Sequence, residues 1–494
     1  MQAQSRVLVI GLDSADRTLL HRYVEEGRLP VIASLVERSG AGLLKSPPAL
    51  GDDAAWASFA TSLSPGRHGR YYHKHMEPGT YRTPWFRDHH FAHAAFWQTL
   101  SDAGCNVGVI DVPKCPLGEI RQGLQICDWL VHGRDGETRS APESLAPDIL
   151  RRFGDDDTDR PGSGEYICGM PSLSHEQERV FLERLLNGLE QKVNAASELL
   201  ARGGWDLFLV VFKECHCVQH HFWHLLDESH PAHDPQLIDR LGNPVLRVFQ
   251  ALDRAVGTLI EQSGPDTKGI LFSDLGMTSN YTADHLLDEA LLRMEPAFPA
   301  FLRGVYRDGV RIEEKLRSRF LPRSERSFFR GMRRAYQVDH NEISGAIRIN
   351  LAGREPSGRV RPGVERDALC DELASNLMEL VDPDTGERVV ERIVRADEAF
   401  PGERRDHLPD LFAVWRRERP ITGLASPKIG EVRVKTPEYR PGNHVENGFF
   451  VSFGCDERAS RAREASLEDI GPTIAKLLGK ELPDVDGEPI AGVE

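Results

Sequence analysis

The sequence predicts an α/β fold in which a mostly parallel β-sheet is covered by helices on both faces. Three observations support this prediction: short apolar runs recur along the chain, a helical pattern follows each of them, and nearly every position within a run is apolar. Strands of this kind are typical of parallel sheets that are buried on both faces. The runs lie at residues 6–12 (RVLVIGL), 107–113 (VGVIDVP), 206–212 (DLFLVVF) and 268–274 (KGILFSD).

Polar side chains gather where three of these strands end. Asp13 follows the first strand, the segment KECHCVQH at 213–220 follows the third, and Asp274 closes the fourth. In open parallel sheets, ligands bind at the carboxyl ends of the strands, where the connecting loops converge. We therefore expect the functional site at this edge of the sheet.

Composition disfavours two classes of partner. The chain has 494 residues, of which 40% are hydrophobic and 28% are charged, as in ordinary soluble globular proteins. Its net charge is -15. A nucleic-acid polymer or an anionic membrane is not attracted to so acidic a surface, so we expect neither as the main partner.

The amino-terminal sequence and the cysteines indicate a compartment. The segment MQAQSRVLVIGLDSAD passes directly into a strand, without the basic start, long apolar stretch and cleavage site of a signal peptide. No run approaches the ~20 apolar residues that a spanning helix needs. The eight cysteines are scattered, and the closest pair, Cys215 and Cys217, lacks the spacing of a zinc knuckle or redox motif. We therefore expect a cytoplasmic protein with reduced cysteines.

We expect one domain over residues 1–494, with an insertion at 285–345 that forms a helical cap. The insertion is predicted from a cationic helical stretch that includes GVYRDGVRIEEKLRSRFLPRSERSFFRGMRRAY. Two interpretations stay open for this stretch. It forms either a solvated helical surface, which is the commoner meaning of a charge run, or a cap that supplies arginines to an anionic substrate.

The segment KECHCVQHHFW at 213–223 contains three imidazoles and two thiols. His216 and His220 are four residues apart, so on a helix they share one face and can bind one cation. From spacing alone, buried histidines bonded to carbonyl oxygens are the commoner explanation. The metal interpretation gains support because Asp13, Asp274 and His444 lie where converging loops are expected to bring them together.

Eight segments resemble, in order and in spacing, the type I phosphodiesterase and nucleotide pyrophosphatase family of the alkaline phosphatase superfamily. The resemblance covers nearly the whole chain, so it does not depend on any single short motif. The segments are GLDSAD (11–16), AAWASFATSLSPGRHG (54–69), KECHCVQHHFWH (213–224), FSDLGM (272–277), IRINLAGREPSGRV (347–360), LPDLFAVW (408–415), GNHVENGFF (442–450) and IGPTIAKLLGKELPDVDGEPI (470–490).

The resemblance implies an alkaline-phosphatase-like fold and a site for one or two divalent cations that acts on a small anionic substrate. Carried over by position, the first cation site consists of three side chains, which are His216, His220 and His444. The second consists of Asp13 and Asp274, with Asp52 in the position of the family's nucleophile. These donors suit zinc first, with manganese or iron as alternatives.

Three positions depart from the family pattern. His216 stands where an aspartate is usual, Leu275 stands where the second site has a histidine, and Asp52 or Asp53 stands where a threonine or serine attacks. A carboxylate at position 52 can act as a nucleophile, a base or a metal ligand. We expect a ligand, because a cation relieves the repulsion among three carboxylates. Water activated by the cation then replaces the usual phospho-threonine route.

Three functions stay open after these departures. The first is a metal-dependent hydrolase that acts on a phosphate or sulfate ester or on a phosphodiester, with nucleotide-like substrates suggested by the resemblance. The second is a repurposed transferase or lyase, for which the three histidines would allow iron as the metal. The third is a catalytically silent binding protein. The retained ligand-type side chains favour an active metal site.

Overall fold

The computed structural model describes residues 6–493, except 40, 134–135, 157, 159–172, 297–302, 311, 314–326, 436 and 456–463. Its larger part is a nine-stranded sheet in the order β17-β2-β16-β7-β1-β6-β3-β4-β5. In that order the strands are Glu464–Ser466, Gly42–Lys45, Gly448–Phe453, Thr267–Ser273, Arg6–Leu12, Leu207–Phe212, Val107–Ile110, Gly123–Cys127 and Arg139–Ala141. The central strand β1 pairs in parallel with β6 and β7, whereas β16 and β5 run antiparallel to their neighbours. The predicted fold class is confirmed.

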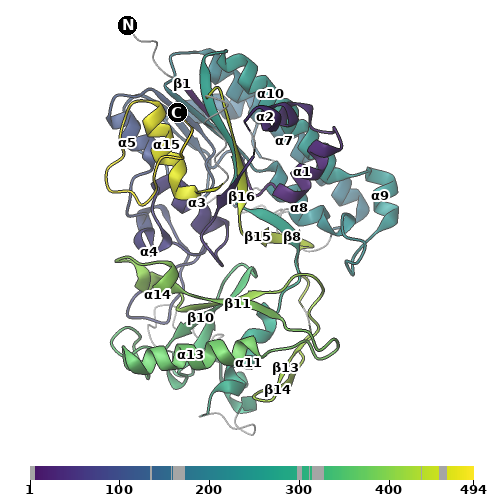
Figure 1. The fold of residues 1–494 in the computed structure, drawn as a ribbon, viewed down its shortest axis with the longest axis vertical. Helices are drawn as coiled ribbons and strands as arrows, with labels where there is room; N and C mark the ends of the chain where they lie inside the picture. The colour runs from purple at the N-terminus through teal and green to yellow at the C-terminus, as the bar shows by residue number, and fades with distance from the viewer. Residues whose placement is uncertain are drawn as a thin grey trace.

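Helices cover both faces of this sheet (Figure 1). The side chains of β1 alternate between the two faces, so that Ile10 and Leu12 belong to one apolar core and Val7 and Val9 belong to the other. The first core is covered by α1 (Arg17–Glu25), α2 (Pro30–Ser39), α6 (Leu145–Phe153), α7 (His175–Ala201), α8 (Glu214–Phe222), α9 (Pro235–Leu241) and α10 (Pro244–Ser263). The second is covered by α3 (Asp52–Thr61), α5 (Phe96–Asp102) and α15 (Ile470–Leu477).

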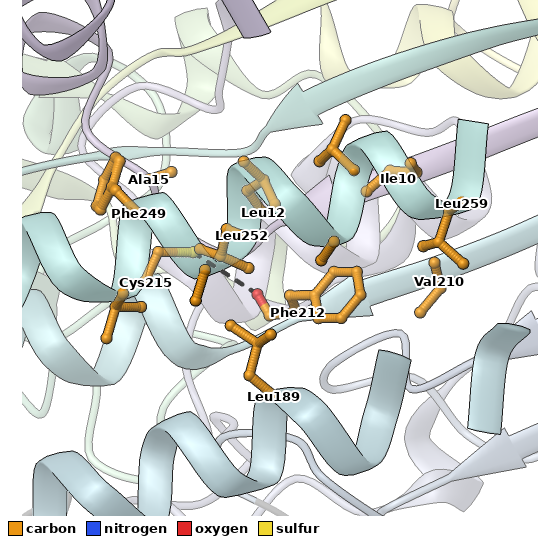
Figure 2. Packing of buried hydrophobic residues seen from close by; sticks show 14 of the residues in the cluster. Ile10, Leu12, Ala15, Leu189, Val210, Phe212, Cys215, Phe249, Leu252 and Leu259 are labelled. Atoms are coloured by element: carbon orange, nitrogen blue, oxygen red, sulfur yellow. Dashed lines mark hydrogen bonds between the residues drawn. The ribbon is translucent and has the colours of Figure 1, made fainter. Parts of the chain in front are cut away.

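Packing in the first core explains why the strands are apolar at almost every position. Figure 2 shows Leu252 and Leu259 of α10 close to Ile10, Leu12 and the β6 side chains. Complete burial of one aliphatic side chain stabilises the fold by about 1.5–3 kcal/mol, and a strand that is covered on both faces contributes this at each position. The core therefore fixes the strand ends, from which the polar side chains project.

A second lobe is inserted between β8 (Gly276–Ser279) and β15 (Gly442–Val445), which pair with each other in antiparallel fashion. It contains the four-stranded antiparallel sheet β11-β12-β10-β9 and an apolar core of its own (Figure 1). Its elements are α11 (Asp284–Met294), β9 (Ala335–Val338), β10 (Ser344–Ile349), α13 (Val364–Met378), β11 (Val390–Arg395), α14 (Ala396–Ala399), β12 (Leu411–Trp415), β13 (Leu424–Ser426) and β14 (Gly430–Val432).

The segment 285–345, expected as a helical cap, contributes most of α11 and all of β9 to this lobe. Parts of the segment, 297–302, 311 and 314–326, lie outside the described residues. The lobe continues past residue 345 to β14, and it contains a four-stranded sheet as well as helices. That the lobe acts as a cap stays a prediction. Among the described helices, none has the length and apolar character needed to cross a membrane.

Candidate metal centre and substrate cavity

Three imidazoles meet at the carboxyl edge of the central sheet. His216 and His220 lie on one face of α8, which begins directly after β6, and His444 lies on β15. One nitrogen of each ring lies within 4.8 Å of one nitrogen of the other two, and all three residues are at most 2% exposed. The helical spacing and the resemblance thus selected residues that the fold does bring together. That they bind a metal stays a prediction.

A hydrogen bond fixes the orientation of the His220 ring. His220 Nδ1 lies 2.7 Å from the carbonyl oxygen of Gly442, so this nitrogen carries the proton and donates it. His220 Nε2 then keeps its lone pair and lies 3.3 Å from His444 Nε2. Burial lowers the pKa of His220 and of His444 well below the usual value, so both rings are neutral. A carbonyl bond to the far nitrogen is the usual device that orients a metal-binding imidazole.

Asp13 and Asp274 lie beside the imidazoles. Asp13 Oδ1 is 3.2 Å from His216 Nδ1, and Asp274 Oδ1 accepts a hydrogen bond from the Ser14 backbone N–H at 2.8 Å. The second oxygen of each carboxylate has no partner among the described residues, nor has His216 Nε2. Burial, and next the charge of Asp13, raise the pKa of Asp274 well above its usual value. These unsatisfied acceptors fit a cation, which relieves the repulsion between the carboxylates.

The structure separates the roles of Asp52 and Asp53, which begin α3. Asp53 forms a buried ion pair with Arg70 at 2.7 Å. Asp52 lies 3.7 Å from Lys114 Nζ, and one of its oxygens is within 4.8 Å of a His216 nitrogen. Burial favours the neutral acid, but the charge of Lys114 together with other neighbouring groups outweighs it and lowers the pKa of Asp52. Asp52 is therefore an ionised carboxylate beside the imidazoles, whereas Asp53 is committed to Arg70.

A close approach of the second lobe shapes this corner of the site. A Cβ atom on Gly51, which precedes α3, would lie 1.5 Å from Asn341 Nδ2 of the second lobe. Asn341 also accepts, through its carbonyl oxygen, a hydrogen bond of 2.9 Å from Asn443. Glycine at position 51 thus lets the lobe reach the start of α3, next to Asp52.

Sequence reasoning missed His132. Leu275, which replaces the family's histidine, is fully buried in an apolar cluster and offers no ligand atom. His132 instead brings a fourth imidazole into the region, and its ring centroid is 3.9 Å from that of His216. The available signal was the apolar run GLQIC at 123–127, which forms β4 and is followed by WLVHG at 129–133. A histidine that follows a strand end is, like Asp13, a candidate for the site at this edge of the sheet.

A cavity of about 380 Å³ opens beside the cluster, with Asp52, His132 and His444 in its wall. Cationic side chains also line it, and among the described residues Arg440 forms no salt bridge. Two histidine-rich runs of the sequence contribute to the wall as well, through Tyr72 and His73 in one and Phe91 in the other. Cations with aromatic surfaces suit a small anionic substrate that has an apolar part.

Comparisons with known proteins identify the fold and the family. A model described as type I phosphodiesterase / nucleotide pyrophosphatase matches residues 7–442. The structure of murine ectonucleotide pyrophosphatase / phosphodiesterase 5 is 14% identical, with a TM-score of 0.50 and coverage of 98% of both chains. Phosphonoacetate hydrolase from Sinorhizobium meliloti 1021 is 13% identical, with a TM-score of 0.49 and coverage of 91% of this chain and 90% of that one. No curated protein sequence matches the chain.

Proposed function

The chain belongs to the type I phosphodiesterase / nucleotide pyrophosphatase family, and from this premise we propose that it hydrolyses a phosphate ester or phosphodiester of a small anionic substrate. Hydrolysis of phosphoesters with divalent metal ions is the activity that the family supports. Our finer proposal assigns a divalent cation to His216, His220 and His444. The observation that carries it is the convergence of three buried imidazoles beside a cavity with cationic side chains.

The donor set suits the proposed cation. Neutral imidazoles with buried lone pairs favour zinc, and they also accept iron or manganese where a carboxylate completes the site. When bound, such a cation stabilises charge on the phosphoryl oxygens and lowers the pKa of water. Asp13 orients His216 through the contact between Oδ1 and Nδ1, and the Gly442 carbonyl orients His220. The protein itself therefore supplies ligands of fixed direction.

We assign the attack on phosphorus to water, because aspartates occupy positions 52 and 53 where the family has a hydroxyl side chain. In this reaction a water oxygen forms the new bond to phosphorus, the ester oxygen leaves, and a proton passes from water to the leaving oxygen. Asp52 acts as a ligand in our proposal, and Lys114 balances its charge across 3.7 Å. Arg440, without a salt bridge among the described residues, is the candidate partner for the substrate's anionic group.

A second candidate function is a non-hydrolytic metalloenzyme, a transferase or lyase. The observation in its favour is the all-imidazole triad, which iron also accepts. A silent binding protein is disfavoured, because the chain keeps a set of ligand-type side chains that lie together in the site. We also propose a cytoplasmic location, which fits the lack of a disulfide bond among the described cysteines.

The test is metal analysis of protein purified without chelator, followed by turnover of aryl phosphate, diester and sulfate esters. We expect bound zinc, iron or manganese and measurable hydrolysis of a phosphate ester or diester. His220→Ala should lose the cation assigned to the three imidazoles and reduce kcat/KM by ~10³-fold or more, because several kcal/mol of charge stabilisation disappear.

A matched control variant is His221→Gln on the same helix. His221 is 5% exposed, and its ring centroid lies 4.4 Å from that of Phe181, away from the cluster. Its replacement should leave the metal content unchanged. Abundant bound metal without any ester turnover would favour the second candidate, and protein that binds no metal would refute both.

A further inference from the structure

We propose that His132 is a metal ligand, and that His132 and Asp52 hold a second cation beside the one on the three-imidazole triad. This inference rests on the proposed function and extends its site. The two groups of ligand atoms that the fold brings within 4.8 Å are His216, His220 and His444, and Asp52, His132 and His216. The second group contains a residue that neither the spacing of the sequence nor the resemblance supplied.

The two groups define two neighbouring positions. The ring centroid of His132 is 3.9 Å from that of His216 but 6.3 Å from that of His220. Within 4.8 Å, His132 thus groups with Asp52 and His216 and not with His220 and His444. It faces the Asp52 carboxylate instead, so the pair spans a separate position next to the first.

His216 lies between these positions and can serve one of them. Its Nδ1 points to Asp13 Oδ1 at 3.2 Å, which leaves Nε2 as the coordinating atom, and that atom has no partner among the described residues. The residue is fully buried. One lone pair binds one ion, so the second ion needs donors of its own. Asp52 and His132 are those donors, one anionic and one neutral.

A buried ion pair and its hydrogen bonds anchor the loop that carries His132. Asp111 accepts hydrogen bonds from the backbone N–H groups of Trp129 and Leu130, at 3.0 and 2.8 Å. Lys192 Nζ of α7 lies 3.1 Å from Asp111 Oδ2 and donates a hydrogen bond of 2.6 Å to the Leu130 carbonyl oxygen. Asp111 and Lys192 are fully buried. A loop that is anchored by a buried ion pair presents a ligand of fixed position, as a metal site requires.

The chemistry of the pair suits a divalent cation that faces the substrate. His132 offers an imidazole nitrogen within 4.8 Å of a carboxylate oxygen of Asp52. Asp52 supplies a negative charge. Both side chains line the cavity, so a cation between them is accessible from solvent and to the oxygens of a bound anion. Two ions on either side of a phosphoryl group stabilise its attacking and leaving oxygens.

The test is the number of zinc ions bound by the full-length protein after chelation, dialysis and titration with zinc alone. We expect two ions in the wild type, one in His132→Gln, and one in Asp52→Asn, because the last two variants lose the same ion. His220→Ala should retain the other ion, the one held by Asp52 and His132. His221→Gln is the matched control and should bind two. Absorption of cobalt-substituted protein gives a second readout that does not depend on turnover.

Several results would overturn the inference without touching the proposed function. A wild type that binds a single ion would do so, and so would His132→Gln with two ions of unchanged affinity. A wild type that binds no ion at all would instead refute the proposed function. Circular dichroism shows whether each variant is folded. If His132→Gln does not fold, Asp52→Asn decides the test, and retention of both ions there overturns the inference.

Discussion

The charge network around Arg354 in the second lobe differs from the metal centre in how completely its charges are paired. In the lobe, Arg348 donates to Glu355 at 2.7 Å, and Arg354 donates to the two oxygens of Asp410 at 3.0 and 2.6 Å. Asp410 also accepts a hydrogen bond of 2.8 Å from the Ile349 backbone N–H. Each charge meets an opposite one inside the protein, so this network is complete without a ligand.

The metal centre is buried to the same degree but is incomplete. Asp13 Oδ2, Asp274 Oδ2 and His216 Nε2 have no hydrogen-bond partner among the described residues. An unsatisfied buried polar atom costs about 1–3 kcal/mol, so a cluster of them indicates that something else binds there. The comparison shows that residue type and burial alone do not separate a structural network from a ligand site. In these two regions the difference lies in how completely the buried polar atoms are paired within the protein.

The largest expected effect comes from breaking the complete network. Asp410→Asn removes one of the two buried carboxylates that pair with Arg354, the other being Glu355, and should lower the free energy of unfolding by about 3 kcal/mol. Chemical denaturation measures the change. Asp406→Asn is the matched control: Asp406 lies 3.7 Å from the same arginine, but its side chain is 59% exposed, so the expected loss is below about 1 kcal/mol. Equal losses in both variants would remove the distinction between buried and exposed pairs.

The same chemical change at the metal centre should have the opposite sign. Asp274→Asn keeps the size of the side chain and removes a carboxylate whose pKa is raised by burial and by Asp13. A raised carboxyl pKa lowers stability as the pH rises above the unfolded-state value, so at pH 7 the metal-free variant should be more stable than the metal-free wild type. Denaturation in the presence of chelator measures it. A loss of stability would show that the centre is balanced without a ligand.

The strand ends and part of the site could be predicted because their signals are local. Asp13 and Asp274 each follow a continuous apolar run, and the spacing of His216 and His220 is the period of a helix. His444 was identified through the resemblance, since β15 contains four residues and no apolar run marks it. The sheet, the triad's helix and the polar edge therefore follow from short stretches of sequence.

His132 and the second sheet could not be predicted, because contacts between distant residues place them. His132 owes its position to Asp111 and Lys192, which hold its loop from two other elements. The lobe's sheet depends on the pairing of β10 with β12, in which Ser344 lies opposite Val414. Neither contact leaves a periodic pattern in the sequence.

His340 lies between the two regions and gives a pH-dependent test. Burial lowers its pKa to about 4, and its ring stacks on Tyr71 at 6.1 Å. The unfolded chain therefore binds a proton near pH 6.5 that the folded protein binds near pH 4. This contribution to stability is complete above pH 6.5 and is lost as the pH falls toward 4, by about 1.4 kcal/mol at pH 5.5. In His340→Gln, the loss of unfolding free energy between pH 7 and pH 5.5 should be smaller than in the wild type by about 1.4 kcal/mol. An equal loss in both proteins would contradict the lowered pKa of His340.

The smallest expected effect concerns Arg440, which lines the cavity beside the metal centre. The lobe's buried arginines are committed to carboxylates, whereas Arg440 lines the cavity and forms no salt bridge among the described residues. If a substrate anion is its partner, Arg440→Ala should raise KM about fivefold, or about 1 kcal/mol, with little change in kcat, because one charge-assisted contact is lost from both ground and transition states. Steady-state kinetics with a phosphodiester measures this. Arg433→Ala, which breaks an exposed pair with Asp384, is the control. A fall in kcat at constant KM would instead place Arg440 at the transition state, and an unchanged kcat/KM would mean that the cavity recognises its anion through other groups.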